Sequence, residues 1–126
     1  MPNGRNPLNL VRSIPRNGAT GVARNVRPVL VFNRNVVNNS IWNNNRRQIS
    51  LRRGNQRVGI RVTRVSQSAD FSKRFNIYVR PNNTLRPLTN YRLVVSPRLV
   101  ANNGRRLGRT VTRRFRTRRN YAPREE

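Results

Sequence analysis

The sequence contains no cysteine and no histidine, and it has only three acidic residues. Without cysteine, neither a disulfide framework nor a cysteine-based zinc site can form. Without histidine, the chain lacks the commonest general base and the commonest metal ligand. The acids are Asp70, Glu125 and Glu126, and the last two end the chain, where residues are usually poorly ordered.

These shortages remove most catalytic chemistry. A pair of catalytic carboxylates must flank one substrate bond, but the body of the chain offers only Asp70. A magnesium or calcium site needs several oxygen ligands, usually including more than one carboxylate. Asp70 itself is interpreted as a turn residue that accepts hydrogen bonds. We therefore expect no enzyme activity, no catalytic residue, no metal ligand, no cofactor and no small-molecule substrate.

Long apolar segments are also missing. No run approaches the 18 or so residues that a membrane-spanning helix requires, and residues 1–5 lack the apolar stretch of a signal peptide. The 126 residues fit one domain of ordinary size. We expect that domain at residues 10–118, between an N-terminal extension (1–9) and a C-terminal tail (119–126), and we expect it to be monomeric.

Basic residues, in contrast, are abundant. The formal net charge is +25, and of the 28 basic residues only Lys73 is lysine. Such a charge repels itself within a compact domain and attracts polyanions such as DNA, RNA, heparin-like polysaccharides and anionic cell-wall polymers. Disorder is the usual alternative for so charged a chain. However, Leu, Ile, Val and Phe make up about a quarter of the residues, above the roughly one-fifth typical of disordered chains.

The apolar residues recur at every second position, which is typical of half-buried β-strands. The alternating sets are Val58, Ile60 and Val62; Phe75, Ile77 and Val79; Tyr91, Leu93 and Val95; and, more weakly, the segment 111–117. A continuous apolar run at 29–32 predicts a central strand, and segments 10–14 and 48–51 predict edge strands. About seven strands separated by Pro, Gly and Asn turns predict an all-β, immunoglobulin-like antiparallel β-sandwich.

Helical pattern is nearly absent, with one short turn of helix expected within residues 36–42. The large side chains expected in or near the core are Phe32, Trp42, Tyr91 and Phe115. Trp42 has an alternative role as an exposed stacking residue, but no row of aromatic residues accompanies it. Core packing is therefore the favoured interpretation.

Several segments resemble bacterial Ig-like domains, which occur as repeats in S-layer and other bacterial surface proteins. The opening is IPRNGATGV (14–22) followed by PVLVF (28–32). The later landmarks keep the same order: VRP (79–81), LRP (85–87), NYRLVV (90–95), NG (103–104) and FRT (115–117). The resemblance implies a sandwich with Phe32 and Phe115 inside, a tyrosine corner at Tyr91, a cell-surface origin and no shared active site.

The sequence departs from that family in its charge. Where the family commonly has Asp, Glu, Lys, Ser or Thr, this chain has Arg or Asn. Two origins stay open: deliberate supercharging of an ordinary surface, or natural adaptation to a polyanionic partner.

The densest basic run lies at residues 113–119. On a strand, Arg114, Arg116 and Arg118 share one face at a spacing of about 7 Å, close to the spacing of successive phosphates in nucleic acid. The alternative is a solvated strand face without a partner. The predicted polyanion-binding residues are Arg46, Arg47, Arg52, Arg53, Arg105, Arg106, Arg109, Arg113, Arg114, Arg116, Arg118 and Arg119.

No recognition helix and no surface row of aromatics is predicted, so any binding would be electrostatic, sensitive to salt and indifferent to sequence. Two functions follow from these observations. The first is an Ig-like structural or interaction module with a cationic surface that binds polyanions non-specifically. The alternative is a natural nucleic-acid-binding structural protein of a ribonucleoprotein or virion.

Overall fold

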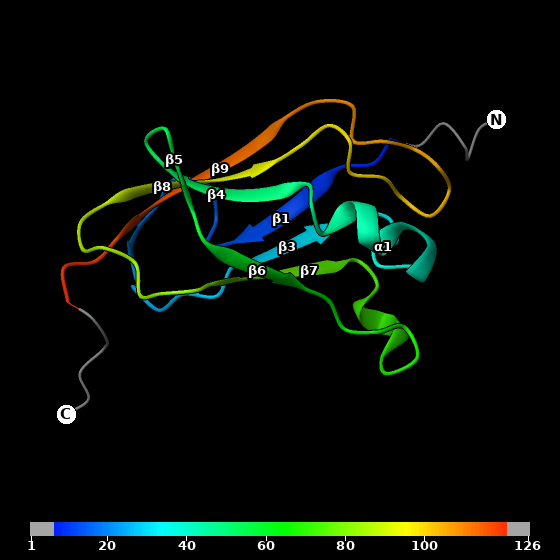
Figure 1. Cartoon of the computed structure of the whole chain (residues 1–126), viewed down its shortest axis with the longest axis horizontal. Helices are drawn as coiled ribbons and strands as arrows, with labels where there is room; N and C mark the ends of the chain where they lie inside the picture. The colour runs from blue at the N-terminus through cyan, green and yellow to red at the C-terminus, as the bar shows by residue number, and fades with distance from the viewer. Residues whose placement is uncertain (1–6, 121–126) are drawn as a thin grey trace.

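The computed structural model describes residues 7–120, which form two β-sheets packed face to face (Figure 1). The four-stranded sheet has the order β1 (Leu10–Ile14), β3 (Val29–Phe32), β7 (Asn76–Pro81) and β6 (Ile60–Thr63). The five-stranded sheet has the order β2 (Ala19–Val22), β9 (Val111–Thr117), β8 (Asn90–Val95), β4 (Ile49–Arg53) and β5 (Gln56–Val58). The predicted all-β sandwich is confirmed.

The described residues contain nine strands, where about seven were predicted. One extra strand is β2, which follows the turn at Gly18 and pairs with β9 in parallel, whereas the other neighbours are antiparallel. The other arises because the predicted strand through residues 58–62 is divided. Val58 ends β5 in one sheet, and Ile60 begins β6 in the other. The chain changes sheets at Gly59, so the alternation continues although the strand does not.

The predicted positions within the sheets are partly right. β3 is central and β1 is an edge strand, as expected. The expected edge strand at 48–51 is wrong, because β4 lies between β8 and β5. The chain turns back at Gly54 (φ 59°) and pairs Arg53 with Gln56 and Leu51 with Val58. This short hairpin covers the half of β4 nearest the turn.

The core fills the space between the sheets. Phe32, Tyr91 and Phe115 are buried as predicted, and the rings of Tyr91 and Phe115 stack with centroids 5.7 Å apart. The Tyr91 hydroxyl accepts a hydrogen bond from the Arg86 N–H (2.9 Å), the arrangement of a tyrosine corner. Leu8 is fully buried in the same core, so the packed structure includes a residue that the sequence analysis placed in the extension.

The helical segments are short. α1 (Asn39–Asn45) lies a few residues later than expected, because the Asn38 side chain caps it by accepting from the Ser40 N–H (3.0 Å). Trp42 is partly buried against the core, beneath the Arg64 guanidinium at 5.3 Å, so it is a near-core residue. No helix within residues 7–120 is long and apolar enough to span a membrane.

Residues 1–6 and 121–126 lie outside the described residues, and with them the predicted end of the tail, including Glu125 and Glu126.

Candidate polyanion-binding surface

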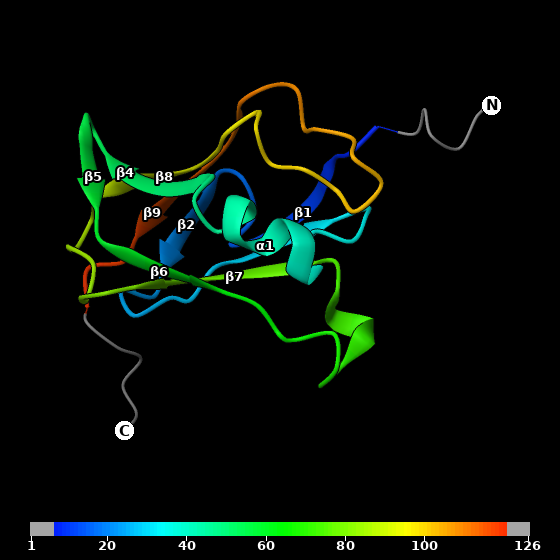
Figure 2. The same ribbon diagram turned by 45° about the vertical axis from the view of Figure 1, so that its right-hand side comes forward.

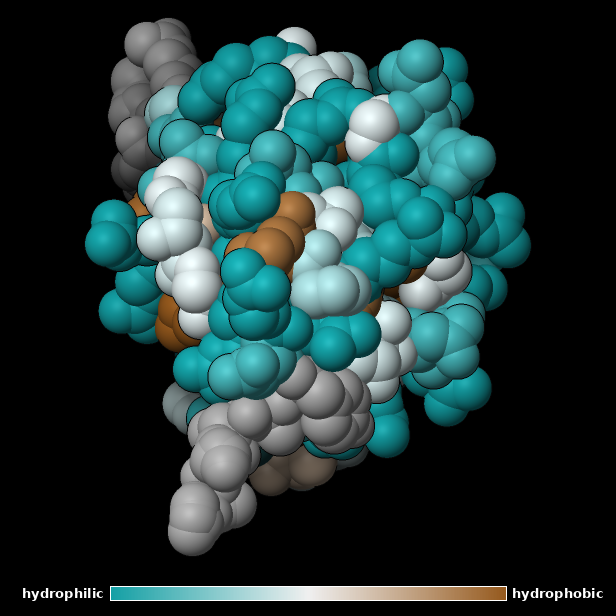
Figure 3. Space-filling view, turned by 90° about the vertical axis from the view of Figure 1, so that its left-hand side faces the viewer, coloured by the Kyte–Doolittle hydropathy of each residue, from teal (hydrophilic) through white to brown (hydrophobic). Residues whose placement is uncertain are grey.

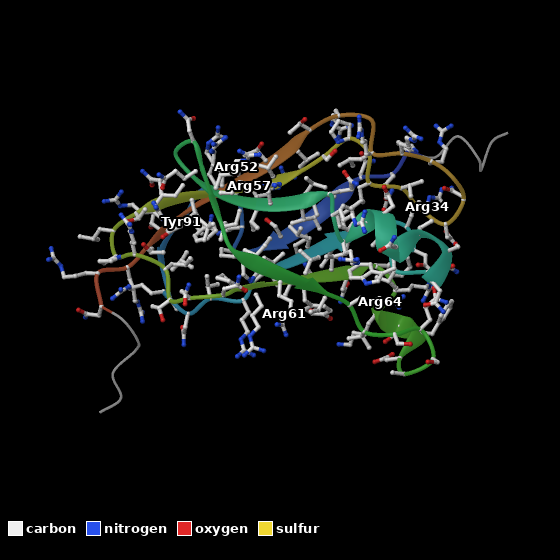
Figure 4. All side chains as sticks on the ribbon, viewed as in Figure 1. Arg34, Arg52, Arg57, Arg61, Arg64 and Tyr91 are labelled. Carbon is white, nitrogen blue, oxygen red and sulfur yellow. The ribbon has the colours of Figure 1, made fainter. Side chains whose placement is uncertain are left out.

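Four arginines lie side by side on the outer face of the five-stranded sheet. Arg57 on β5 is in register with Arg52 on β4, Arg52 with Arg92 on β8, and Arg92 with Arg114 on β9. We call Arg57, Arg52, Arg92 and Arg114 the arginine row. Neighbouring strands are about 4.8 Å apart, so the row crosses about 14 Å of sheet at right angles to the strands. The side chains of Arg52 and Arg57 are adjacent in Figure 4.

The row faces solvent because its strand neighbours face the core. Three residues next to row members in the chain are buried, namely Leu51, Leu93 and Phe115. Successive side chains on a strand point to opposite faces of the sheet. The row members are accordingly exposed or half-buried. Hydrophilic surface dominates the end of the molecule seen in Figure 3, with only small hydrophobic areas.

A shallow hollow of about 500 Å³ adjoins the row. It is bordered by Arg92, Arg114 and Arg116, and by small residues including Gly18 and Gly54. Arg116 is two residues beyond Arg114 on β9, on the same face and about 7 Å farther along the strand. The hollow is therefore bordered by three arginines and has room for a phosphate or sulfate group, and the Arg92 guanidinium donates to the Gly54 carbonyl (2.6 Å) at its edge.

Within the described residues 7–120, no carboxylate neutralises the row. Asp70 is the single acid within residues 7–120. It caps the short 3₁₀ helix η2 (Phe71–Lys73) by accepting hydrogen bonds from the Ser72 hydroxyl (2.5 Å) and the Ser72 N–H (3.0 Å). These bonds lower the pKa of Asp70. The turn role predicted for Asp70 is confirmed.

Each arginine of β9 lies on the face of the strand that the sequence predicted. Arg114 and Arg116 lie on the outer face of β9, while Arg113 lies on the inner side opposite Leu93, half-buried, and donates to the Thr112 carbonyl (3.0 Å). Arg118 follows the end of β9, and its N–H bonds to the Val22 carbonyl (2.8 Å).

The other predicted arginines are distributed over separate places. Arg105, Arg106 and Arg109 are exposed in the long loop between β8 and β9, where Arg109 donates to the Asn9 side chain (3.2 Å). Arg53 points away from the row and donates to Gln56 (2.8 Å). Of the two remaining groups, Arg46 and Arg47 follow α1, and Arg119 is exposed at the end of the described chain.

Two members of the row, Arg57 and Arg92, were not among the predicted polyanion-binding residues. Neither belongs to a basic run, so neither attracts notice in the sequence. The available signal was the alternation around Arg92, which already placed this residue on the outer face of its strand. No group of three His, Cys, Asp or Glu side chains lies together within the described residues.

Comparisons with known proteins support the fold. The N-terminal part of the bacterial S-layer protein SbsC superposes with a TM-score of 0.56 at 14% sequence identity, covering 90% of this chain and 24% of that one. Domains 1–6 of the same protein give 0.61 at 13% identity, covering 90% and 14%. An L,D-transpeptidase from Mycobacterium smegmatis gives 0.51 at 16% identity, covering 90% and 41%. No curated protein sequence matches the chain.

This chain therefore spans less than half the length of each of those structures. The likeness shows a shared fold, which confirms the immunoglobulin-like form of the sandwich. A family model described as bacterial Ig-like domain matches residues 4–117, which is most of the sequence. The chain belongs to the bacterial Ig-like domain family.

Proposed function

We propose that this domain is a non-enzymatic structural module whose five-stranded sheet binds linear polyanions through the arginine row. The observation that carries the proposal is the register: Arg57, Arg52, Arg92 and Arg114 lie opposite one another on four adjacent strands. Like charges placed directly opposite on a sheet are destabilising. A bound polyanion would relieve that repulsion, so binding and folding would favour each other.

The chemistry of the row suits sulfate and phosphate groups. Guanidinium groups are planar, stay charged at any physiological pH and form paired hydrogen bonds with oxyanions. Duplex DNA carries about one negative charge per 1.7 Å of its axis, so a 14 Å row meets several charges at once. The shared ligand chemistry is a repeating oxyanion, whether it comes from DNA, RNA or a sulfated polysaccharide.

The same surface offers no means of distinguishing one base sequence from another. Direct readout of duplex DNA uses side chains on a helix or β-ribbon that enters the major groove. The helix α1 has seven residues and lies outside the five-stranded sheet. Contacts from the row would fall on the backbone, which fixes position without reading sequence.

The structural role is supported by the family and by the coverage of the similar structures. The S-layer protein and the L,D-transpeptidase are both much longer than this chain, so the domain that resembles it is one part of each. A compact β-sandwich with a core independent of its surface charge suits such modular use.

The experiment compares two double variants with the same change in charge. Arg92→Gln with Arg114→Gln removes the middle and one end of the row, whereas Arg12→Gln with Arg80→Gln removes two exposed arginines from the other sheet. Binding to duplex DNA, RNA and heparin is measured between about 0.05 and 0.2 M salt. Circular dichroism melts verify that each variant folds cooperatively.

With all four row arginines bound to duplex DNA, log K is expected to fall with log salt at a slope of about −3.6. The row variant should make that slope shallower by about 2. The variant of the other sheet should change it much less. Equal losses from both variants would mean that the whole surface binds and that the row has no special role. Strong preference for one RNA fold or one sequence would instead support the nucleic-acid-binding structural protein.

A further inference from the structure

A groove opens at the side of the sandwich where the chain passes from one sheet to the other. It has a volume of about 670 Å³ and lies between β4 and β6. Its floor is formed by Ile49, Val58, Ile60 and Val62, and its rim by Arg46, Arg47, Arg57 and Arg61. We call it the crossover groove. In Figure 2, β4 and β6 lie along the same side of the molecule, one in each sheet, and the chain connects them through β5.

One wall of the groove is an unpaired strand edge. β6 is the last strand of the four-stranded sheet and pairs only with β7 among the described strands. The Asn82 N–H donates to the Gly59 carbonyl (3.0 Å), and Arg61 pairs with Arg80. Bonded and non-bonded pairs alternate along an antiparallel ladder, so the backbone groups of Ile60 and Val62 point away from β7. These groups are available to an added strand.

The opposite wall of the groove, formed by β4, also has unpaired backbone groups, but over fewer residues. The Ser96 N–H donates to the Gln48 carbonyl (2.8 Å), which places the backbone groups of Ile49 on the side of β4 away from β8. β5 begins to pair with β4 only at Leu51. Unpaired backbone therefore borders the groove in both sheets.

The side chains of the groove are amphipathic. Val58, Ile60 and Val62 pack against the core but are only partly buried. Arg46, Arg47, Arg57 and Arg61 are exposed, and Arg46 is held by its bond to the Asn43 side chain (2.9 Å). An occupant that satisfies all of these groups needs backbone donors and acceptors, apolar side chains and negative charge.

The charge decides which occupant fits. A second copy of this chain carries +25 and would be repelled by the rim. The exposed Arg61 on the edge strand has the same effect, since charged residues on edges oppose pairing between copies. A nucleic acid has no backbone that can extend a β-sheet. An extended acidic peptide meets every requirement.

We propose that the crossover groove binds an extended acidic segment of a partner protein, which adds as a strand to the free edge of β6. Main-chain hydrogen bonds to Ile60 and Val62 would supply affinity, and pockets for alternate side chains would supply specificity. Apolar side chains of the segment enter the floor, and its carboxylates meet Arg46, Arg47 and Arg61. The site differs from the arginine row, with which it shares only Arg57.

The test uses a fluorescently labelled six-residue peptide of alternating glutamate and valine. Three comparison peptides accompany it: all glutamate, alternating glutamate and serine, and the parent with N-methylated amides on the side that would pair. Affinity is measured for the whole chain by fluorescence anisotropy. Amide exchange at Ile60 and Val62 is followed by NMR in the same samples.

The parent peptide should bind, and N-methylation or replacement of valine by serine should weaken binding about 10-fold. Arg47→Gln with Arg61→Gln should cause a similar loss, while the row variant Arg92→Gln with Arg114→Gln should not. Saturating peptide should protect the Ile60 and Val62 amides from exchange.

Two results would overturn the proposal. The first is that the all-glutamate and N-methylated peptides bind as tightly as the parent peptide, which would mean that the groove is only a charged patch. The second is unchanged exchange at Ile60 and Val62 when the peptide is saturating. Because the row variant reports polyanion binding separately, failure here leaves the test of the proposed function intact.

Discussion

The side-chain amide of Asn45 bonds to both backbone polar groups of Val100. Its oxygen accepts from the Val100 N–H (3.0 Å), and its nitrogen donates to the Val100 carbonyl (2.8 Å) and to the Val36 carbonyl (2.8 Å). Asn45 is fully buried. One side chain thus joins the end of α1 to the loop after β8 and to the segment after β3, replacing the backbone partners that a sheet would supply.

Replacing Asn45 with alanine should therefore be strongly destabilising. The change leaves buried donors and acceptors unpaired, each at a cost of about 1–3 kcal/mol, so a total loss of about 3 kcal/mol is expected. Urea denaturation measures it. Asn43→Ala is the matched control, because Asn43 is exposed on the same helix and its side chain accepts from the exposed Arg46 side chain. Similar losses for both variants would show that the buried network contributes little.

Tyr91→Phe should destabilise the fold through a single hydrogen bond. The ring and its stacking on Phe115 are kept, but the Arg86 N–H loses its acceptor. A cost of about 1–2 kcal/mol is expected, measured as a shift in the urea midpoint. The control is Tyr78→Phe, because Tyr78 is half-buried and its hydroxyl accepts from the Asn76 side chain (3.1 Å) rather than from a backbone N–H. The idea fails if Tyr78→Phe is as costly as Tyr91→Phe.

The sequence was sufficient for the sandwich and for most of its inner face. Alternation alone placed Ile77, Val79, Leu93 and Val95 inside, since a two-residue period directly indicates which side of a strand is buried. It could not show that the residues around Gly59 belong to two sheets, because a crossover that keeps the alternation has the same pattern as one strand.

The arginine row and Asn45 were beyond sequence reasoning for related reasons. Register between strands decides which arginines face one another, and Arg57 and Arg92 are 35 positions apart in the chain. The run of three asparagines ending at Asn45 looks uniform, although only its last member turns inward. Both features depend on tertiary packing, which local patterns do not encode.

Arg52→Gln should stabilise the protein at low salt. Arg52 lies directly between Arg57 and Arg92, and opposed like charges cost roughly 0.2–1 kcal/mol per pair. A gain of about 0.5–1 kcal/mol is expected near 0.01 M salt, disappearing near 1 M, where the Debye length is only about 3 Å. Thermal melts across the salt series measure it. Arg12→Gln is the control, because Arg12 lies opposite Val31, and an equal gain there would point to net charge alone.

The acid stability of the domain should depend on Asp70. The hydrogen bond from the Ser72 hydroxyl, then that from the Ser72 N–H and the charge of Lys73, lower the pKa of Asp70 from its ordinary 3.8. A group whose pKa is lower in the folded state stabilises that state when ionised. Its contribution is present at neutral pH and is lost as the pH falls from 3.8 through the lower folded-state pKa.

Two variants separate the carboxylate from its partner. Asp70→Asn should remove this part of the acid-dependent loss, and Ser72→Ala should move the Asp70 titration, followed by carboxyl NMR, toward its ordinary pKa. Since the chain has no histidine, neither variant should change how stability depends on pH between about 5 and 8. An Asp70 titration that Ser72→Ala leaves unmoved would show that the hydroxyl bond does not set its pKa. In that case the remaining causes are the backbone N–H of residue 72, which the variant keeps, and the charge of Lys73, and Lys73→Gln should raise the pKa.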